Sequence, residues 1–206
     1  MSRIIGLVLA GGLSRRMGEN KLLLLLENQR LIDRVIARLR PQCADVLINI
    51  NEPLEGLDTF TCVPDDISGH QGPLAGLAAG LAAARAKHPD ATHLLTAAGD
   101  TPFFPLDLAD RLSAAIDRPD QIAVAADVEG RWHPTFALWP ISLEADLRLF
   151  LAESENRRVR AFVERHPHKA VSFPLLETAG RSIDPFFNIN TPADYQQALS
   201  FLGDRQ

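Results

Sequence analysis

A short loop near the start of the chain combines glycine with basic residues. Gly11 and Gly12 open it, and the cations Arg15, Arg16 and Lys21 follow. Adjacent glycines let a ligand approach the backbone closely, and guanidinium and ammonium groups bind phosphate oxygens. A tight turn carrying solvated charges is the alternative, but three cations within seven residues of an acidic protein favour a site for several phosphates.

The loop fits neither of two common phosphate-binding motifs. Its glycines lack the G-x-G-x-x-G spacing of a dinucleotide-binding loop, and Lys21 precedes a leucine where a Walker loop has Ser or Thr. The chemistry therefore has to be inferred from the residue types themselves.

The glycine-rich loop follows an apolar run over residues 4–10, and a carboxylate, Asp100, follows a second apolar run over residues 92–98. If both runs are strands of a parallel sheet, Asp100 lies in the same crevice as the glycine-rich loop. A bound triphosphate needs a hard cation, which prefers one or two carboxylates together with phosphate oxygens. We expect Asp100 to be a Mg²⁺ ligand, the alternative being an ordinary cap of the next turn.

The elements that position these groups follow from hydrophobic spacing. The first 126 residues alternate between strand and helix patterns, which predicts an α/β fold with an open, mainly parallel sheet and helices on both faces, Rossmann-like in class. The expected strands cover residues 4–10, 46–50, 61–63, 92–98 and 121–126, and the expected helices cover residues 31–39, 73–87 and 105–116.

The second half of the chain is less regular. We expect a turn at Glu129 and Gly130, then a strand, helices over 141–152 and 157–166, a strand over 169–173, and a last helix capped by Thr191. Asn188 and Asn190 alternate in a segment that we expect to be a strand, so both amides would face one side. The length of 206 residues suits a single domain, 1–206, with a nucleotide-binding half (1–126) and an acceptor-binding half (127–206).

Two further groups are ambiguous. Arg157, Arg158 and Arg160 form a second cationic cluster, which is either a phosphate contact or an exposed helix face. His133, before a proline, is better explained as a packed imidazole than as a catalytic base.

Composition excludes several classes of protein. A net charge of -5 without a long basic run argues against nucleic-acid binding, and 46% hydrophobic residues argue against disorder. Cys43 and Cys62 are too few for a disulfide framework or a zinc site. No signal-peptide pattern or membrane-length apolar run occurs, so we expect a soluble, cytoplasmic protein.

The loop from Leu9 to Lys21 resembles the molybdenum cofactor guanylyltransferases (MobA type), within the wider GT-A-like nucleotidyltransferases. It matches their pattern L-A-G-G-x-S-x-R-M-G-x-x-K, with Asn20 where the family often has Asp. The resemblance continues in the segment GPLAG from Gly72, in D-T-P at Asp100, in H-P, and in N-x-N-T-P.

The resemblance implies GTP and molybdopterin as substrates and a role for each motif. The backbone of Leu9, Ala10 and Gly11 would hold the guanine, while the loop cations bind the triphosphate. Nucleotide contacts would also come from Asn49, with Asn51 as its neighbour, and from Asp65, although Asp66 stays possible. The D-T-P aspartate would bind magnesium, and the N-x-N-T-P segment would face molybdopterin.

The expected reaction is transfer of GMP from GTP to the terminal phosphate of molybdopterin, with release of pyrophosphate. Lys21 and Arg15 or Arg16 would neutralise charge on the phosphates, and the product would pass to molybdoenzymes or their chaperones. One alternative is a related cytidylyl- or sugar-phosphate nucleotidyltransferase. A noncatalytic adaptor that binds nucleotide or cofactor is another, although the presence of both Lys21 and Asp100 speaks against it.

Overall fold

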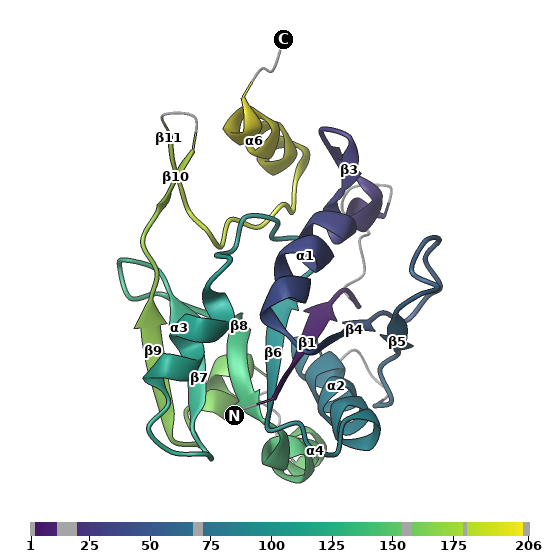
Figure 1. Cartoon of the computed structure of the whole chain (residues 1–206), viewed down its shortest axis with the longest axis vertical. Coiled ribbons are helices and arrows are strands. Elements are labelled where there is room, and N and C mark those ends of the chain that lie inside the picture. Colours follow the sequence, from purple (N-terminus) through teal and green to yellow (C-terminus); the bar gives the residue numbers. More distant parts are fainter. Residues whose placement is uncertain (1–2, 12–19, 68–71, 154–157, 179–180, 204–206) are drawn as a thin grey trace.

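A seven-stranded sheet forms the centre of the protein in the computed structural model, which describes residues 3–11, 20–67, 72–153, 158–178 and 181–203. The strand order is β5-β4-β1-β6-β8-β7-β9. Only β8 runs antiparallel to its neighbours β6 and β7, so the predicted mainly parallel sheet is confirmed (Figure 1). The strands are β1 (Ile4–Leu9), β4 (Asp45–Asn49), β5 (Thr61–Val63), β6 (His93–Ala98), β7 (Ile122–Ala126), β8 (Trp132–Pro140) and β9 (His168–Ser172).

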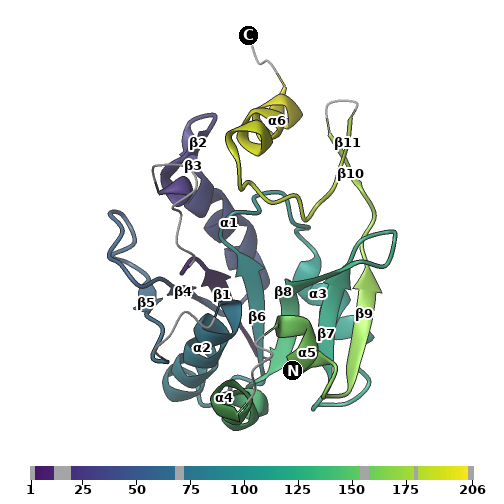
Figure 2. The same cartoon turned by 180° about the vertical axis from the view of Figure 1, so that it is seen from behind.

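Helices cover both faces of this sheet, as Figures 1 and 2 show from opposite sides. One apolar cluster joins the sheet to α1 (Leu31–Leu39) and α3 (Leu108–Ala115). The other joins the opposite face to α2 (Pro73–Lys87), α4 (Glu144–Glu153) and α5 (Val159–Val163). Because both faces are covered, the central strand β6 is buried along its whole length.

The spacing and the size of the buried side chains explain how α1 and α2 pack. In α1, Leu31, Val35 and Leu39 are completely buried and repeat every four residues. Val35 and Leu39 pack in the cluster on the sheet, whereas Leu31 packs in a separate cluster at the start of the helix. In α2, residues 74–81 are all buried, since its small side chains let it pack against the sheet and against α4 at once.

Several of the remaining elements gather beyond the carboxyl edge of the parallel strands. A third apolar cluster joins α6 (Pro192–Leu202) to the first turn of α1 and to β11 (Arg181–Ile183). In both views α6 lies near the β10–β11 hairpin. The hairpins, which the sequence analysis did not anticipate, are β2 (Leu25–Leu26) with β3 (Gln29–Arg30), and β10 (Leu176–Thr178) with β11 (Arg181–Ile183). Short 3-10 helices are η1 (Lys21–Leu23), η2 (Arg40–Gln42) and η3 (Ile141–Leu143).

Three predicted elements differ from the structure. The helix expected over 105–116 begins only at Leu108. The helix expected over 141–152 starts with the 3-10 turn η3 before α4 begins, and the helix expected over 157–166 is reduced to α5. In the part of the chain that the structure describes, no helix could span a membrane.

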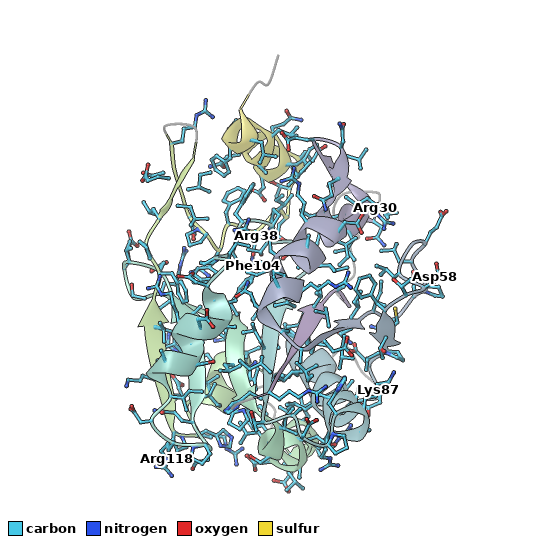
Figure 3. The ribbon with its side chains drawn as sticks, viewed as in Figure 1. Arg30, Arg38, Asp58, Lys87, Phe104 and Arg118 are labelled. Carbon is cyan, nitrogen blue, oxygen red and sulfur yellow. The ribbon has the colours of Figure 1, made fainter. Side chains whose placement is uncertain are left out.

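Arg38 ties α1 to the segment that follows β6. Its guanidinium donates to the carbonyl oxygens of Phe104, at 2.7 Å, and Phe103, at 3.3 Å, and it lies 5.7 Å from the centre of the Phe104 ring (Figure 3). Burial lowers the pKa of Arg38 from its usual value, with a further lowering from nearby Arg34. Arg38 thus anchors the chain just downstream of Asp100.

Candidate active site

The carboxyl ends of four parallel strands bring the predicted nucleotide-binding residues together. Gly11 lies just beyond β1, Asn49 ends β4, Asp65 follows β5, and Asp100 follows β6. Backbone hydrogen bonds continue past the strands: the amide of Ala10 donates to the Asn49 carbonyl, and that of Gly99 donates to the Leu9 carbonyl, each at 2.9 Å. The edge is therefore rigid where the sequence analysis expects the ligand.

Lys21 and Asp100 form an ion pair at the centre of this edge. The Lys21 Nζ lies 2.5 Å from Asp100 Oδ2, and the side chains are 17% and 18% exposed. Lys21 is fixed because it opens the 3-10 helix η1, whose N-cap Asn20 accepts a hydrogen bond from the Leu22 amide at 3.1 Å. A fixed cation beside a carboxylate, both partly accessible, suits the binding of phosphate and metal together.

Residues from the far end of the chain complete the cluster. Lys21 Nζ also donates to Asn190 Oδ1, at 3.0 Å. The Thr101 hydroxyl donates to Asp100 Oδ1, at 3.2 Å, and is hydrogen-bonded to Asn188 Oδ1. The amide of Ile189 donates to the Asp100 carbonyl, at 3.0 Å. The two predicted halves of the chain are thus in direct contact at Lys21 and Asp100.

The segment around Asn188 and Asn190 corrects one prediction. The segment is not a strand, because the Ile189 amide hydrogen-bonds to the Asp100 carbonyl, beyond the end of β6, instead of joining a ladder. Its side chains still alternate: both asparagines are exposed and Ile189 is buried. Thr191 caps α6 as predicted, with Asp194 completing a capping box.

A second polar cluster lies on the β4–β5 side of Asp100. Asn49 is 3% exposed, and its amide donates to Asp65 Oδ1 at 2.8 Å and to the Val63 carbonyl at 3.1 Å. Asn51 donates to Asp65 Oδ2 at 3.0 Å and accepts from the Asp65 amide at 2.8 Å. Both oxygens of the Asp65 carboxylate are therefore held in place by neutral amides.

The geometry separates Asp65 from Asp66. Asp66 forms an ion pair with Arg148 of α4, at 2.6 Å. Asp65 instead shares the asparagine network that touches Gly11, since a Cβ at Gly11 would lie 3.0 Å from Asn49 Oδ1 and 3.4 Å from Asn51 Nδ2. This placement favours Asp65 as the carboxylate beside the glycine-rich loop.

The structure does not place every predicted site residue in these clusters. Gly12, Arg15, Arg16 and Arg157 fall outside the described residues. Arg160 pairs with Glu164 of the same helix region at 2.8 Å and lies 4.7 Å from the centre of the Trp132 ring.

His133 is a packed imidazole, as expected from the sequence. Its ring stacks on Phe186 with centroids 4.5 Å apart, and its side chain is 15% exposed. Burial is the main cause that lowers the pKa of His133 from its usual value. Burial thus favours the uncharged form of the ring.

Sequence reasoning gave no role to two residues of the site, Thr101 and Asn51. Thr101 lies within the D-T-P motif, where a buried hydroxyl next to a predicted metal ligand was a usable signal. Asn51 was noted only as a neighbour of Asn49, and its contact with Asp65 depends on how β4 and β5 pair.

The donor groups around Asp100 suit a magnesium ion bound mainly through phosphates. Among the residues that the structure describes, no three His, Cys, Asp or Glu side chains gather as a metal cage. Asp100 nevertheless offers carboxylate oxygens beside the amide oxygens of Asn188 and Asn190. All are hard donors, and Mg²⁺ commonly takes one or two carboxylates and fills its other positions with water and substrate phosphates.

Comparison with protein families finds a matching model over most of the chain. The model, described as a MobA-like NTP transferase domain, matches residues 6–170. A molybdenum cofactor guanylyltransferase of Rhizobium meliloti (strain 1021) is 48% identical over 204 residues, covering 97% of this chain and 93% of the relative. A protein of the same name from Mesorhizobium japonicum is 48% identical, covering 97% of this chain and 96% of the relative.

Solved structures show the same fold. A homolog of Mycobacterium tuberculosis Rv0371c from Mycobacterium sp. strain JC1 has a TM-score of 0.73 and 23% identity, covering 97% of this chain and 96% of that chain. Molybdopterin-guanine dinucleotide biosynthesis protein A from Archaeoglobus fulgidus has a TM-score of 0.67 and 20% identity, covering 96% and 97%. A complex of Rv0371c from M. tuberculosis with manganese has a TM-score of 0.68 and 19% identity, covering 97% and 99%.

Proposed function

The chain belongs to the MobA-like NTP transferase family, and we propose that it transfers GMP from GTP to the terminal phosphate of molybdopterin, releasing pyrophosphate. The observation that carries the proposal is the Lys21–Asp100 pair at the carboxyl edge of the sheet, beside Gly11. The shared name of close, nearly full-length relatives supplies the substrates.

The guanine end of the site lies on the β1–β4–β5 side. The backbone of Leu9, Ala10 and Gly11 approaches the base, since the glycine leaves room that a side chain would fill. Asp65 offers a carboxylate for the N–H groups of the guanine edge. Its orientation is set by Asn49 and Asn51, which explains why these buried and half-exposed amides surround it.

The phosphate end lies at Lys21 and Asp100. Lys21, with Arg15 or Arg16 from the loop, donates to the nucleotide phosphates and offsets the charge that develops on the departing pyrophosphate. Asp100 would hold Mg²⁺, which would supply further neutralisation of phosphate charge. The ion pair with Asp100 and the hydrogen bond to Asn190 keep Lys21 in place before the substrates arrive.

This reaction requires no strong general base. The attacking group is a phosphate oxygen that is already ionised, so positioning and charge neutralisation carry the rate. His133 is packed against Phe186, which agrees with a mechanism that needs no general base. Cytoplasmic location and delivery of the product to molybdoenzymes or their chaperones stay predictions from the sequence.

The test is product analysis with each nucleotide in turn. Purified protein is incubated with molybdopterin, Mg²⁺ and one of GTP, ATP, CTP or UTP, and the masses of the pterin products are measured by mass spectrometry. We expect a product heavier than molybdopterin by one guanylyl group, GMP less water, because a pocket that hydrogen-bonds guanine leaves polar groups unpaired with another base. Comparable conversion with CTP would overturn the guanylyl assignment in favour of a cytidylyltransferase.

A further inference from the structure

An open groove of about 340 Å³ borders the site on the side away from Asp65. It is lined by Arg131, His133, Asp184, Phe186, Phe187 and Asn188, together with Trp132. The volume is at the lower end of the range for small-molecule sites, roughly 300–1,000 Å³. The groove is therefore the size for one ring system rather than for a whole dinucleotide.

The groove connects to Asp100 through Asn188. Asn188 lines the groove and is hydrogen-bonded to Thr101, the residue after Asp100. Trp132 and His133 begin β8, and because β8 is antiparallel its start lies at the carboxyl edge, with Trp132 opposite Ala126 at the end of β7. The groove is thus at the same edge of the sheet as the phosphate site.

Strand order places the groove and the polar cluster of Asn49, Asn51 and Asp65 on opposite sides of Asp100. In the order β5-β4-β1-β6-β8-β7-β9, Asp65 follows β5 and Asn49 ends β4, Asp100 follows β6, and His133 lies in β8. Two substrates that react through their phosphates must meet at the phosphate site with their rings pointing apart. A nucleotide base at β4–β5 therefore leaves the β8 side for the ring of the acceptor.

Asp184 is the groove's acceptor group, and its carboxylate is fixed. Its Oδ1 accepts a hydrogen bond from the Phe186 amide at 2.8 Å, and its backbone carbonyl accepts from the Phe187 amide at 3.1 Å. The side chain is 29% exposed. A carboxylate has about four acceptor positions, so Asp184 can still accept from a ligand.

Arg131 supplies donors beside that carboxylate. Its guanidinium lies 3.6 Å from Asp184 Oδ2 and 3.0 Å from Asp127 Oδ2, and its side chain is 69% exposed. Five N–H donors in a planar fork leave some free for a ligand carbonyl. Acceptor and donor thus stand side by side in the wall of the groove.

The charges of the groove disfavour a phosphate. The cation Arg131 stands beside two carboxylates, those of Asp184 and Asp127, and burial lowers the pKa of His133, which favours its uncharged ring. Aromatic rings make up much of the remaining wall. A flat, uncharged ring with adjacent N–H donors and a carbonyl group fits these walls better than an anion does.

We propose that this groove binds the pterin ring of the acceptor, with Asp184 accepting hydrogen bonds from the ring's 2-amino and N3–H groups and Arg131 donating to its 4-oxo group. The inference rests on the proposed function and assigns the second substrate to named residues. Guanine carries the same 2-amino-4-oxo edge, so the test has to separate the two sources of that edge.

The experiment measures binding of molybdopterin and of GTP separately by calorimetry, to the wild type, Asp184→Asn and Asp120→Asn. Asp120 is a matched control because it is also an Arg-paired carboxylate, at 2.6 Å from Arg118. Figure 3 places Arg118 at the opposite end of the molecule from α6. Asp184→Asn should weaken molybdopterin binding by at least about tenfold, the scale of a lost hydrogen bond to a charged group, and leave GTP binding unchanged.

Different outcomes separate the possible failures. Loss of GTP binding in Asp184→Asn, with molybdopterin binding retained, would mean that the groove holds guanine and would overturn the inference. Wild-type affinity for both ligands in Asp184→Asn would also overturn it. Absence of molybdopterin binding and of GMP transfer in the wild type would refute the proposed function itself.

A second comparison does not depend on whether the variant folds. Pterin and lumazine differ because lumazine has a carbonyl where pterin has the 2-amino group. As competitors of molybdopterin binding to the wild type, pterin should be the stronger, since the lumazine carbonyl faces the Asp184 carboxylate. Asp184→Asn should lose this preference because an amide can donate to that carbonyl. Equal competition by pterin and lumazine in the wild type would contradict the assignment of Asp184.

Discussion

Gly76 in helix α2 leaves the space that the buried Asn49 side chain occupies. A methyl group at this position would overlap Asn49 Oδ1 and lie 2.6 Å from its Cγ. Asn49 is 3% exposed and holds Asp65 through its amide. Gly76→Ala should therefore push Asn49 away from Asp65. The substitution would thus alter the nucleotide site indirectly, although no reactive group of the site lies on α2.

Opposing effects determine how much Gly76→Ala changes the free energy of unfolding. Alanine in a helix interior gains about 1 kcal/mol over glycine, whereas overpacking a core costs about 1–3 kcal/mol. Breaking the hydrogen bond from Asn49 to the Asp65 carboxylate costs about 1.5–3 kcal/mol more. We expect Gly76→Ala to destabilise the wild type by roughly 1.5–5 kcal/mol and to weaken GTP binding.

In the Asn49→Ala variant, Gly76→Ala should instead increase the free energy of unfolding. With the amide removed, the new methyl group partly fills the vacated space, and the helix preference of up to about 1 kcal/mol remains. Urea unfolding of the wild type, both single variants and the double variant measures the coupling, while calorimetry follows GTP. Equal effects of Gly76→Ala in both backgrounds would refute the steric argument.

Other substitutions test the remaining parts of the site. Asp100→Asn should nearly abolish turnover while unfolding at the wild-type urea concentration, because a neutral amide binds Mg²⁺ poorly; near wild-type turnover would remove Asp100 as the metal ligand. Lys21→Ala should lower kcat by on the order of a hundredfold or more, and a change confined to the KM for GTP would make it a plain binding residue. Replacing Asn188 and Asn190 together with Ala should weaken molybdopterin binding by a few kcal/mol at most and GTP binding less, as titrations with each ligand would show; equal losses would mean that the two halves of the chain do not divide the substrates. Hydrogen bonds from the Asn190 amide and then from Thr191 lower the pKa of the Asp194 carboxyl, so its capping stabilisation is present above the unfolded pKa of about 3.9 and is lost as pH falls through the lower folded value. Asp194→Asn should cost on the order of 1 kcal/mol at pH 7, and urea unfolding should show the difference from wild type shrinking in acid; a constant difference would exclude the charge as its cause.

Elements with a strong local pattern were predictable from the sequence. The helix over residues 31–39 and the helix beginning at Pro73 agree with α1 and α2 at both ends, because stripe spacing, small residues and proline at the first turn are local signals. The strand over residues 61–63 agrees with β5.

Features that depend on distant contacts were not predictable. The insertion of β8 between β6 and β7 follows from pairings across the sheet, which no local pattern encodes. The hairpins β2–β3 and β10–β11 are only two or three residues per strand, too short for a period to appear.

The site was predictable as a set of residues but not as a network. Motifs pointed to Lys21, Asp100 and Asn190 separately, but the hydrogen bonds that join them span 79 and 169 positions of the chain. The segment at Asn190 has the side-chain alternation of a strand, yet the Ile189 amide bonds to the Asp100 carbonyl beyond β6. Alternation alone therefore could not distinguish a strand from this irregular segment.

The fate of the phosphates of GTP tests the central claim most directly. GTP labelled at the α-phosphate, and GTP labelled at the γ-phosphate, are each incubated with the wild-type protein, molybdopterin and Mg²⁺, and the pterin product is separated from pyrophosphate. Transfer of GMP predicts that the α label appears in the pterin product and the γ label only in pyrophosphate. Appearance of the γ label in the pterin, or release of pyrophosphate with no α label on the pterin, would contradict the account.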